Sequence, residues 1–89
     1  MNSLADETET ITVYGTAWCP DCLRARRVLD GRRVAYRWVD IDLDRAAARL
    51  VQEVNRGFRS VPTIVFPDGS ILVEPSNAEL GRHLDQLGE

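Results

Sequence analysis

The chain has 89 residues and a formal net charge of −3, and its 14 acidic residues outnumber 11 basic ones, all arginine. A chain of this length has room for one hydrophobic core and therefore one domain. The acidic balance argues against a nucleic-acid partner. No apolar run reaches the roughly 18 to 20 residues of a membrane span, and the acidic first residues do not resemble a signal peptide, so we predict a cytoplasmic protein without a membrane partner.

Residues 1–9 lack apolar periodicity and carry three acids, which predicts a flexible tail in front of a domain of residues 10–89. The domain opens with Ile11 and Val13, in a short β-branched and aromatic run that stops at Gly15. This pattern is typical of a buried strand.

From Pro20 the pattern becomes helical, because proline suits the first helical position and apolar residues recur at helical spacing as far as Gly31. Cys19 is therefore expected at the N-terminus of this helix. A second strand is predicted over residues 34–40, and a second helix follows it and ends near Gly57. The apolar stripe expected on that second helix consists of Ala47, Leu50, Val51 and Val54.

The last part of the chain predicts a β-hairpin and a final helix. Residues 63–66 and 71–73 are strand-forming and flank the turn at residues 67–70. Ser76 is the expected N-cap of the final helix, and Glu79 three residues later completes a capping box. The order β-α-β-α-β-β-α predicts an α/β fold, a mixed four-stranded sheet with three helices on its two faces.

The motif Cys19-Pro20-Asp21-Cys22 contains both cysteines of the chain and is the main indication of function. In a cytoplasmic protein this spacing indicates redox chemistry or a metal site. The free N–H groups and the dipole at a helix N-terminus stabilise a thiolate, so Cys19 is the predicted nucleophile. Cys22, one turn further along and more buried, is the predicted resolving thiol with the higher pKa.

Two metal-binding alternatives are compatible with a cysteine pair. A zinc site needs two more Cys or His ligands, and the only further candidate is His83, which we expect at the rim of the last helix. An iron–sulfur cluster shared between two chains would need one thiolate from each chain and two from a small thiol. We predict no metal ligands and no bound cofactor, and we keep a non-enzymatic cluster carrier as the alternative.

The segment Trp18-Cys19-Pro20-Asp21-Cys22, with Ser60-Val61-Pro62-Thr63 about 40 residues later, resembles the glutaredoxin branch of the thioredoxin superfamily. Further short segments resemble the mycoredoxins of actinobacteria: Val39-Asp40-Ile41-Asp42, Ala46-Ala47-Ala48, Val54-Asn55-Arg56-Gly57, Asp68-Gly69-Ser70 and Pro75-Ser76. The resemblance implies the thioredoxin/glutaredoxin fold. It also implies a thiol–disulfide oxidoreductase that reduces mixed disulfides between proteins and a small thiol co-substrate, mycothiol or glutathione.

The resemblance implies a cis bond at Val61-Pro62, with Val61 presenting its backbone to the bound thiol; without it, a trans proline opening a strand would be expected. Arg59 lies where many glutaredoxins place a side chain near the small thiol, and it either pairs with a carboxylate of that thiol or stays solvated. Trp18 either packs against the end of the sheet, which is the preferred arrangement, or forms an exposed platform for substrate.

Two departures from the glutathione-using members favour mycothiol as the co-substrate. Those members usually carry Lys or Arg shortly before the first cysteine, where this chain has Thr16-Ala17-Trp18. They also carry Gly-Gly and an acidic turn before the last helix, where this chain has Pro75-Ser76-Asn77-Ala78. The predicted substrate-binding residues are Trp18, Pro20, Asp21, Arg59, Val61, Pro62, Ser76 and Asn77.

A general protein-disulfide reductase of the thioredoxin type is the second candidate, although thioredoxins typically read Cys-Gly-Pro-Cys. The expected partners are S-thiolated or disulfide-containing proteins and the small thiol, and a monomer is expected. Arg24, Arg26 and Arg27 are expected to form the solvated face of the first helix.

Overall fold

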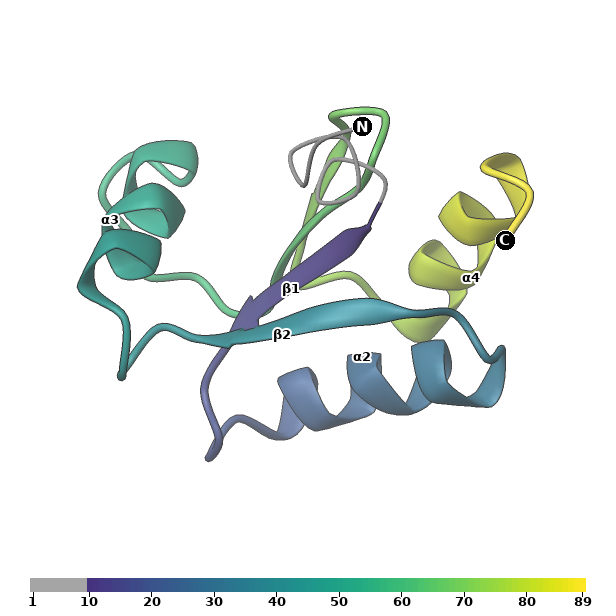
Figure 1. Cartoon of the computed structure of the whole chain (residues 1–89), viewed down its shortest axis with the longest axis horizontal. Helices are drawn as coiled ribbons and strands as arrows, with labels where there is room; N and C mark the ends of the chain where they lie inside the picture. The colour runs from purple at the N-terminus through teal and green to yellow at the C-terminus, as the bar shows by residue number, and fades with distance from the viewer. Residues whose placement is uncertain (1–9) are drawn as a thin grey trace, which may run out of the picture.

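The computed structural model describes residues 10–89, and the predicted tail of residues 1–9 lies outside them. The elements, in chain order, are β1 (Ile11–Gly15), α2 (Pro20–Gly31), β2 (Tyr36–Asp40), α3 (Arg45–Val54), β3 (Thr63–Val65), β4 (Ile71–Val73) and α4 (Asn77–Gln86) (Figure 1). The predicted order of strands and helices is confirmed. No helix within residues 10–89 is both long enough and apolar enough to cross a membrane.

The four strands form one mixed sheet in the order β2-β1-β3-β4. Strand β1 runs parallel to β2 and antiparallel to β3, and β3 and β4 form the antiparallel hairpin. Parallel pairing of β1 and β2 is possible because α2 provides the long crossover between them. The predicted sheet is therefore confirmed, and the loops that follow β1 and β2 leave it at the same edge.

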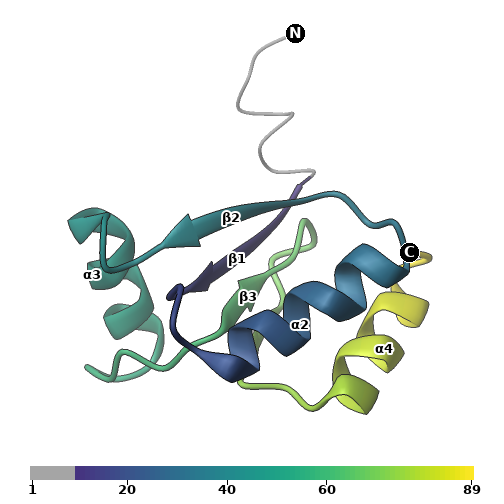
Figure 2. The ribbon, with the colours of Figure 1, turned by 90° about the horizontal axis from the view of Figure 1, so that it is seen from below.

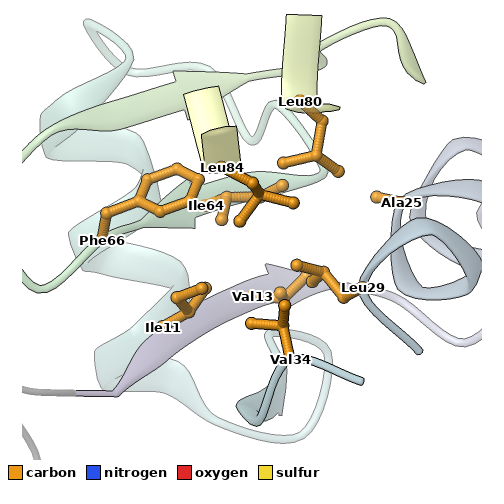
Figure 3. Close-up of a cluster of buried hydrophobic side chains, with 9 residues drawn as sticks. All are labelled: Ile11, Val13, Ala25, Leu29, Val34, Ile64, Phe66, Leu80 and Leu84. Carbon is orange, nitrogen blue, oxygen red and sulfur yellow. The ribbon is translucent and has the colours of Figure 1, made fainter. Parts of the chain in front are cut away.

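The helices cover both faces of the sheet, as predicted. Successive strand residues point to opposite faces, so Ile11 and Val13 join a cluster with α2 and α4, whereas Tyr14 packs against the cluster under α3. Helices α2 and α4 lie side by side in Figure 2, and the strands separate them from α3 in Figure 1. Figure 3 shows the larger cluster, made of Ile11, Val13, Ala25, Leu29, Val34, Ile64, Phe66, Leu80 and Leu84.

Two local predictions needed correction. Strand β2 begins at Tyr36 instead of Val34, because the Val34 N–H donates to the Leu29 carbonyl (3.0 Å) and still closes the end of α2. On α3 only Ala47 and Val51 are buried, whereas Leu50 and Val54 remain 39% and 37% exposed. The contact between α3 and the sheet is therefore narrower than the apolar stripe predicts.

The capping box at the start of α4 is present as predicted. The Ser76 hydroxyl accepts a hydrogen bond from the Glu79 N–H (3.1 Å), and the Glu79 carboxylate accepts one from the Ser76 N–H (2.8 Å). The second of these bonds lowers the pKa of Glu79. Each backbone N–H that is satisfied in this way would otherwise be unpaired at the helix end.

Replacing Ser76 by alanine is therefore expected to lower the free energy of unfolding by about 1 kcal/mol, measured by urea denaturation. Asn77→Ala is the matched control, because the Asn77 side chain makes no hydrogen bond within residues 10–89, and we expect it to leave stability nearly unchanged. Equal stability of Ser76→Ala and the wild type would contradict a capping role.

Candidate active site

Cys19 is the N-cap of α2, as the sequence predicts. Its side chain accepts a hydrogen bond from the Cys22 N–H (3.2 Å), and its own N–H donates to the Thr16 carbonyl (3.3 Å) in the turn that leaves β1. Pro20 occupies the first helical turn, where no N–H is needed. The Cys19 sulfur therefore lies against the free backbone donors of the helix start, and the residue keeps 8% of its surface exposed.

Cys22 is almost completely buried, with 1% of its surface exposed. Burial and, next, the hydrogen bond with Cys19 raise the pKa of the Cys22 thiol to about 12. A thiol with this pKa remains protonated at neutral pH and is a poor nucleophile. The two cysteines are thus adjacent but differ in burial, and the pKa of Cys22 is raised above the ordinary thiol value.

Gly15, the last residue of β1, allows the strand to approach the cysteines closely. A Cβ atom at this position would lie 2.6 Å from the Cys22 Sγ and 2.7 Å from the ring of Trp38. No side chain fits in this space without a shift of its neighbours. The sequence pattern marked Gly15 only as the end of a strand, because the close approach depends on how α2 and β2 pack.

The Val61-Pro62 bond is cis, as the resemblance implied, and Pro62 is fully buried. The Val61 carbonyl oxygen lies 3.9 Å from the Cys19 Sγ. Two side chains hold this loop. The Thr63 hydroxyl donates to the Ser60 carbonyl (2.8 Å) and accepts from the Asn55 amide (3.1 Å), which links the loop to the end of α3. No sequence pattern indicates that Thr63 and Asn55 hold this loop.

Trp18 is 72% exposed, so the preferred prediction of a packed ring was wrong. Its indole N–H donates to one carboxylate oxygen of Asp42 (2.9 Å), and Arg59 donates to the other (2.9 Å). The sequence left two alternatives for the Arg59 side chain, an ion pair with a carboxylate of the small thiol or solvation. In the structure it forms an ion pair with Asp42 of the protein itself. No sequence pattern indicates the contact with Asp42, which is 24 residues away from Trp18 in the chain.

The other predicted binding residues have different surroundings. Asp21 forms an exposed ion pair with Arg24 (3.2 Å), one turn along α2. Ser76 caps α4, and neither it nor Asn77 is among the residues that line the hollow beside Trp18, which are Thr16, Trp18, Ile41, Asp42, Arg59 and Val61.

The helix face expected to be solvated is less uniform than predicted. Arg24 and Arg27 are exposed, but the Arg26 guanidinium lies 4.3 Å from the centroid of the Trp38 ring. Arg26 also donates to the hydroxyl of Tyr36 (3.4 Å). Its contacts with β2 therefore remove Arg26 from the solvated set.

His83 contacts residues other than the cysteines. Its Nε2 atom is 2.7 Å from the Ser70 hydroxyl oxygen, and its ring packs against Phe66 with centroids 4.4 Å apart. This is the rim position expected for it. Within residues 10–89, no cluster of three or more His, Cys, Asp or Glu side chains could hold a metal ion.

A buried pair of unequal thiols at a helix start, facing a cis proline, is the arrangement expected of a redoxin. The family model for glutaredoxins matches residues 11–71 of this chain. The chain belongs to the glutaredoxin family. This glutaredoxin is 49% identical over 80 residues to a provisionally named glutaredoxin of Mycobacterium tuberculosis, covering 90% of this chain and 95% of that protein. It is 38% identical over 77 residues to mycoredoxin 1 of Corynebacterium glutamicum, covering 86% and 95%.

Solved structures agree with this assignment. The crystal structure of a thioredoxin-like protein aligns with a TM-score of 0.68 and 29% identity, covering 88% of this glutaredoxin and 99% of that chain. NrdH-redoxin of Escherichia coli aligns with a TM-score of 0.70 and 22% identity, covering 82% and 92%, and that likeness concerns the fold alone. This glutaredoxin therefore has the thioredoxin/glutaredoxin fold. As a member of the glutaredoxin family it is a thiol–disulfide oxidoreductase that needs no prosthetic group and uses a small thiol and disulfide-bearing proteins as substrates.

Proposed function

We propose that this glutaredoxin reduces mixed disulfides between proteins and mycothiol, in the cytoplasm and as a monomer, through its domain of residues 10–89. The observation that carries the proposal is the inequality of the two thiols. Cys19 lies at a helix N-terminus with part of its surface exposed, whereas Cys22 is buried with a pKa of about 12. Only Cys19 combines access with a thiolate-stabilising position.

In the proposed reaction the Cys19 thiolate attacks the mycothiol sulfur of the mixed disulfide. The bond between the two substrate sulfurs breaks, the protein leaves as a thiolate and takes up a proton, and mycothiol remains disulfide-bonded to Cys19. A second mycothiol, as its thiolate, then attacks the mycothiol sulfur, which releases Cys19 and forms the mycothiol disulfide. Burial, the main cause of the raised pKa of Cys22, does not depend on a free Cys19 thiol. It therefore also disfavours attack of Cys22 on a Cys19 that carries mycothiol, and so favours this route, in which one protein thiol is sufficient.

Two observations support mycothiol over glutathione as the co-substrate. The chain is 38% identical to a protein named mycoredoxin 1. Thr16-Ala17-Trp18, directly before Cys19, contains no cation that could pair with a carboxylate of glutathione, and Arg59 is already paired with Asp42. The proposed binding residues beside Cys19 are Trp18, Pro20, Asp21, Arg59, Val61 and Pro62, with Ser76 and Asn77 at the start of α4.

The test is the turnover of one peptide as its mycothiol mixed disulfide and as its glutathione mixed disulfide, each with its own thiol as reductant. We expect a higher kcat/KM for the mycothiol substrate. A preference for glutathione would overturn the assignment of the thiol. Reduction of protein disulfides with a flavoprotein reductase, and of neither mixed disulfide, would instead indicate the thioredoxin-type activity.

A further inference from the structure

A groove of about 240 Å³ lies beside the nucleophile. It is lined by Thr16, Trp18, Ile41, Asp42, Arg59 and Val61. Val61 connects this groove to the active thiol, because its carbonyl oxygen is the atom 3.9 Å from the Cys19 Sγ. A small thiol that is disulfide-bonded to Cys19 can therefore extend its head group into the groove.

The Asp42 carboxylate is held in a defined position within this groove. The parallel pairing of β1 and β2 continues to the hydrogen bond from the Ile41 N–H to the Gly15 carbonyl (2.9 Å), which fixes the start of the loop. The Asp42 N–H then donates to the Asp40 carboxylate (2.9 Å). Both carboxylate oxygens of Asp42 have partners, the Trp18 indole and the Arg59 guanidinium. Asp42 is thus oriented from three sides.

This arrangement makes the groove a poor site for a carboxylate. Among the residues that line this groove the one cation is Arg59, which already has a carboxylate partner at 2.9 Å, and an incoming anion would also be repelled by Asp42. The ion pair is exposed enough to exchange partners, with 50% of the Arg59 side chain and 41% of the Asp42 side chain accessible. A negatively charged head group must compete with Asp42 for Arg59.

The same residues suit hydroxyl groups. A carboxylate accepts hydrogen bonds from hydroxyls, a guanidinium donates to them, and an exposed indole offers an apolar face to the carbon skeleton of a sugar.

We propose that Asp42 is a specificity-determining residue, which makes the groove select an uncharged, polyhydroxylated small thiol over a carboxylate-bearing one. The inference rests on the proposed function for the identity of the occupant, and it explains how that occupant is recognised. Mycothiol, whose head group is a sugar joined to inositol, has the required chemistry. Glutathione, with two carboxylates, is the ligand that Asp42 would reject.

The test measures binding without the redox reaction. S-methyl mycothiol and S-methyl glutathione are titrated into the full chain carrying Cys19→Ser, and the Trp18 indole N–H resonance is followed by NMR. We expect the S-methyl mycothiol to bind more tightly. Adding Asp42→Asn keeps an acceptor for the Trp18 indole but removes the charge. It should shift the ratio of the two dissociation constants toward S-methyl glutathione by about fivefold, and about 1 M salt should remove most of this gain.

Asp30→Asn is the matched control, because it makes the same charge change on the exposed last turn of α2, outside the groove. An unchanged ratio in Asp42→Asn, or an equal shift in Asp30→Asn, would overturn the inference. The turnover assay reports separately on the proposed function. If neither mixed disulfide is reduced while the ratio of dissociation constants shifts as expected, the proposed function is wrong and the groove selectivity stands. If the mycothiol mixed disulfide is reduced while this ratio stays constant, the proposed function stands and the role of Asp42 is wrong.

Discussion

Replacing Cys19 by serine is expected to lower turnover of the peptide–mycothiol mixed disulfide by at least about a thousandfold. Losses of rate of this size are typical when an enzyme loses the side chain that forms its covalent intermediate. Serine at the same N-cap keeps the local hydrogen bond but is not ionised at neutral pH. Cys22→Ser should retain a substantial part of the activity, because the proposed route uses a second small thiol in place of Cys22. The measurement is steady-state turnover with mycothiol as reductant.

Both variants should unfold at similar temperatures to the wild type. A loss of turnover would then reflect loss of the reacting thiol and not loss of the folded state.

Alkylation provides an independent check. At neutral pH a small alkylating reagent should label Cys19 in the native protein, whereas Cys22, buried and with its pKa raised to about 12, should be labelled only after unfolding. If Cys22→Ser is as inactive as Cys19→Ser, the reaction needs both thiols and the one-thiol route is wrong.

Gly15→Ala is expected to be strongly destabilising for a change of one methyl group. The added Cβ would lie 2.6 Å from the Cys22 Sγ and 2.7 Å from the Trp38 ring. Both distances are shorter than the non-bonded contacts that Cβ atoms make in real proteins. Overpacking of this kind costs about 1 to 3 kcal/mol, which lowers the melting temperature of a domain of this size by on the order of 10 °C. Thermal unfolding followed by circular dichroism measures the effect.

Gly31→Ala is the matched control for this substitution. A Cβ at Gly31, the last residue of α2, would meet nothing within 4 Å, and the residue does not have a positive φ. Alanine is the better helix former, so this variant should be as stable as the wild type or more stable by up to about 1 kcal/mol. Similar melting temperatures for Gly15→Ala and Gly31→Ala would show that β1 and α2 can separate without cost.

Much of the fold follows from interactions between residues close together in the chain, and such interactions can be predicted from the sequence. Helix starts are encoded within four residues, at Cys19-Pro20 and in the capping box of Ser76 and Glu79. The β-α-β crossover rule then determines that the first two strands are parallel. The N-cap position of Cys19 follows from the same local geometry, because only the N-cap faces unpaired N–H groups. The burial that raises the pKa of Cys22 depends instead on tertiary packing.

The groove beside Cys19 depends on contacts between distant parts of the chain. Trp18 and Asp42 meet because parallel β1 and β2 end at the same edge of the sheet, and the turn after Asp40 sets the direction of Asp42. Arg59 reaches them from the loop before the cis proline.

By itself, then, the sequence determined the order of elements and the N-caps Cys19 and Ser76, because these depend on short-range patterns along the chain. Only the tertiary structure decided that Trp18 is exposed, that Gly15 has no room for a side chain and that Asp42 neutralises Arg59. The physical reason is that strand register and helix packing bring together side chains that are far apart in the chain. No periodic pattern in the sequence predicts such contacts.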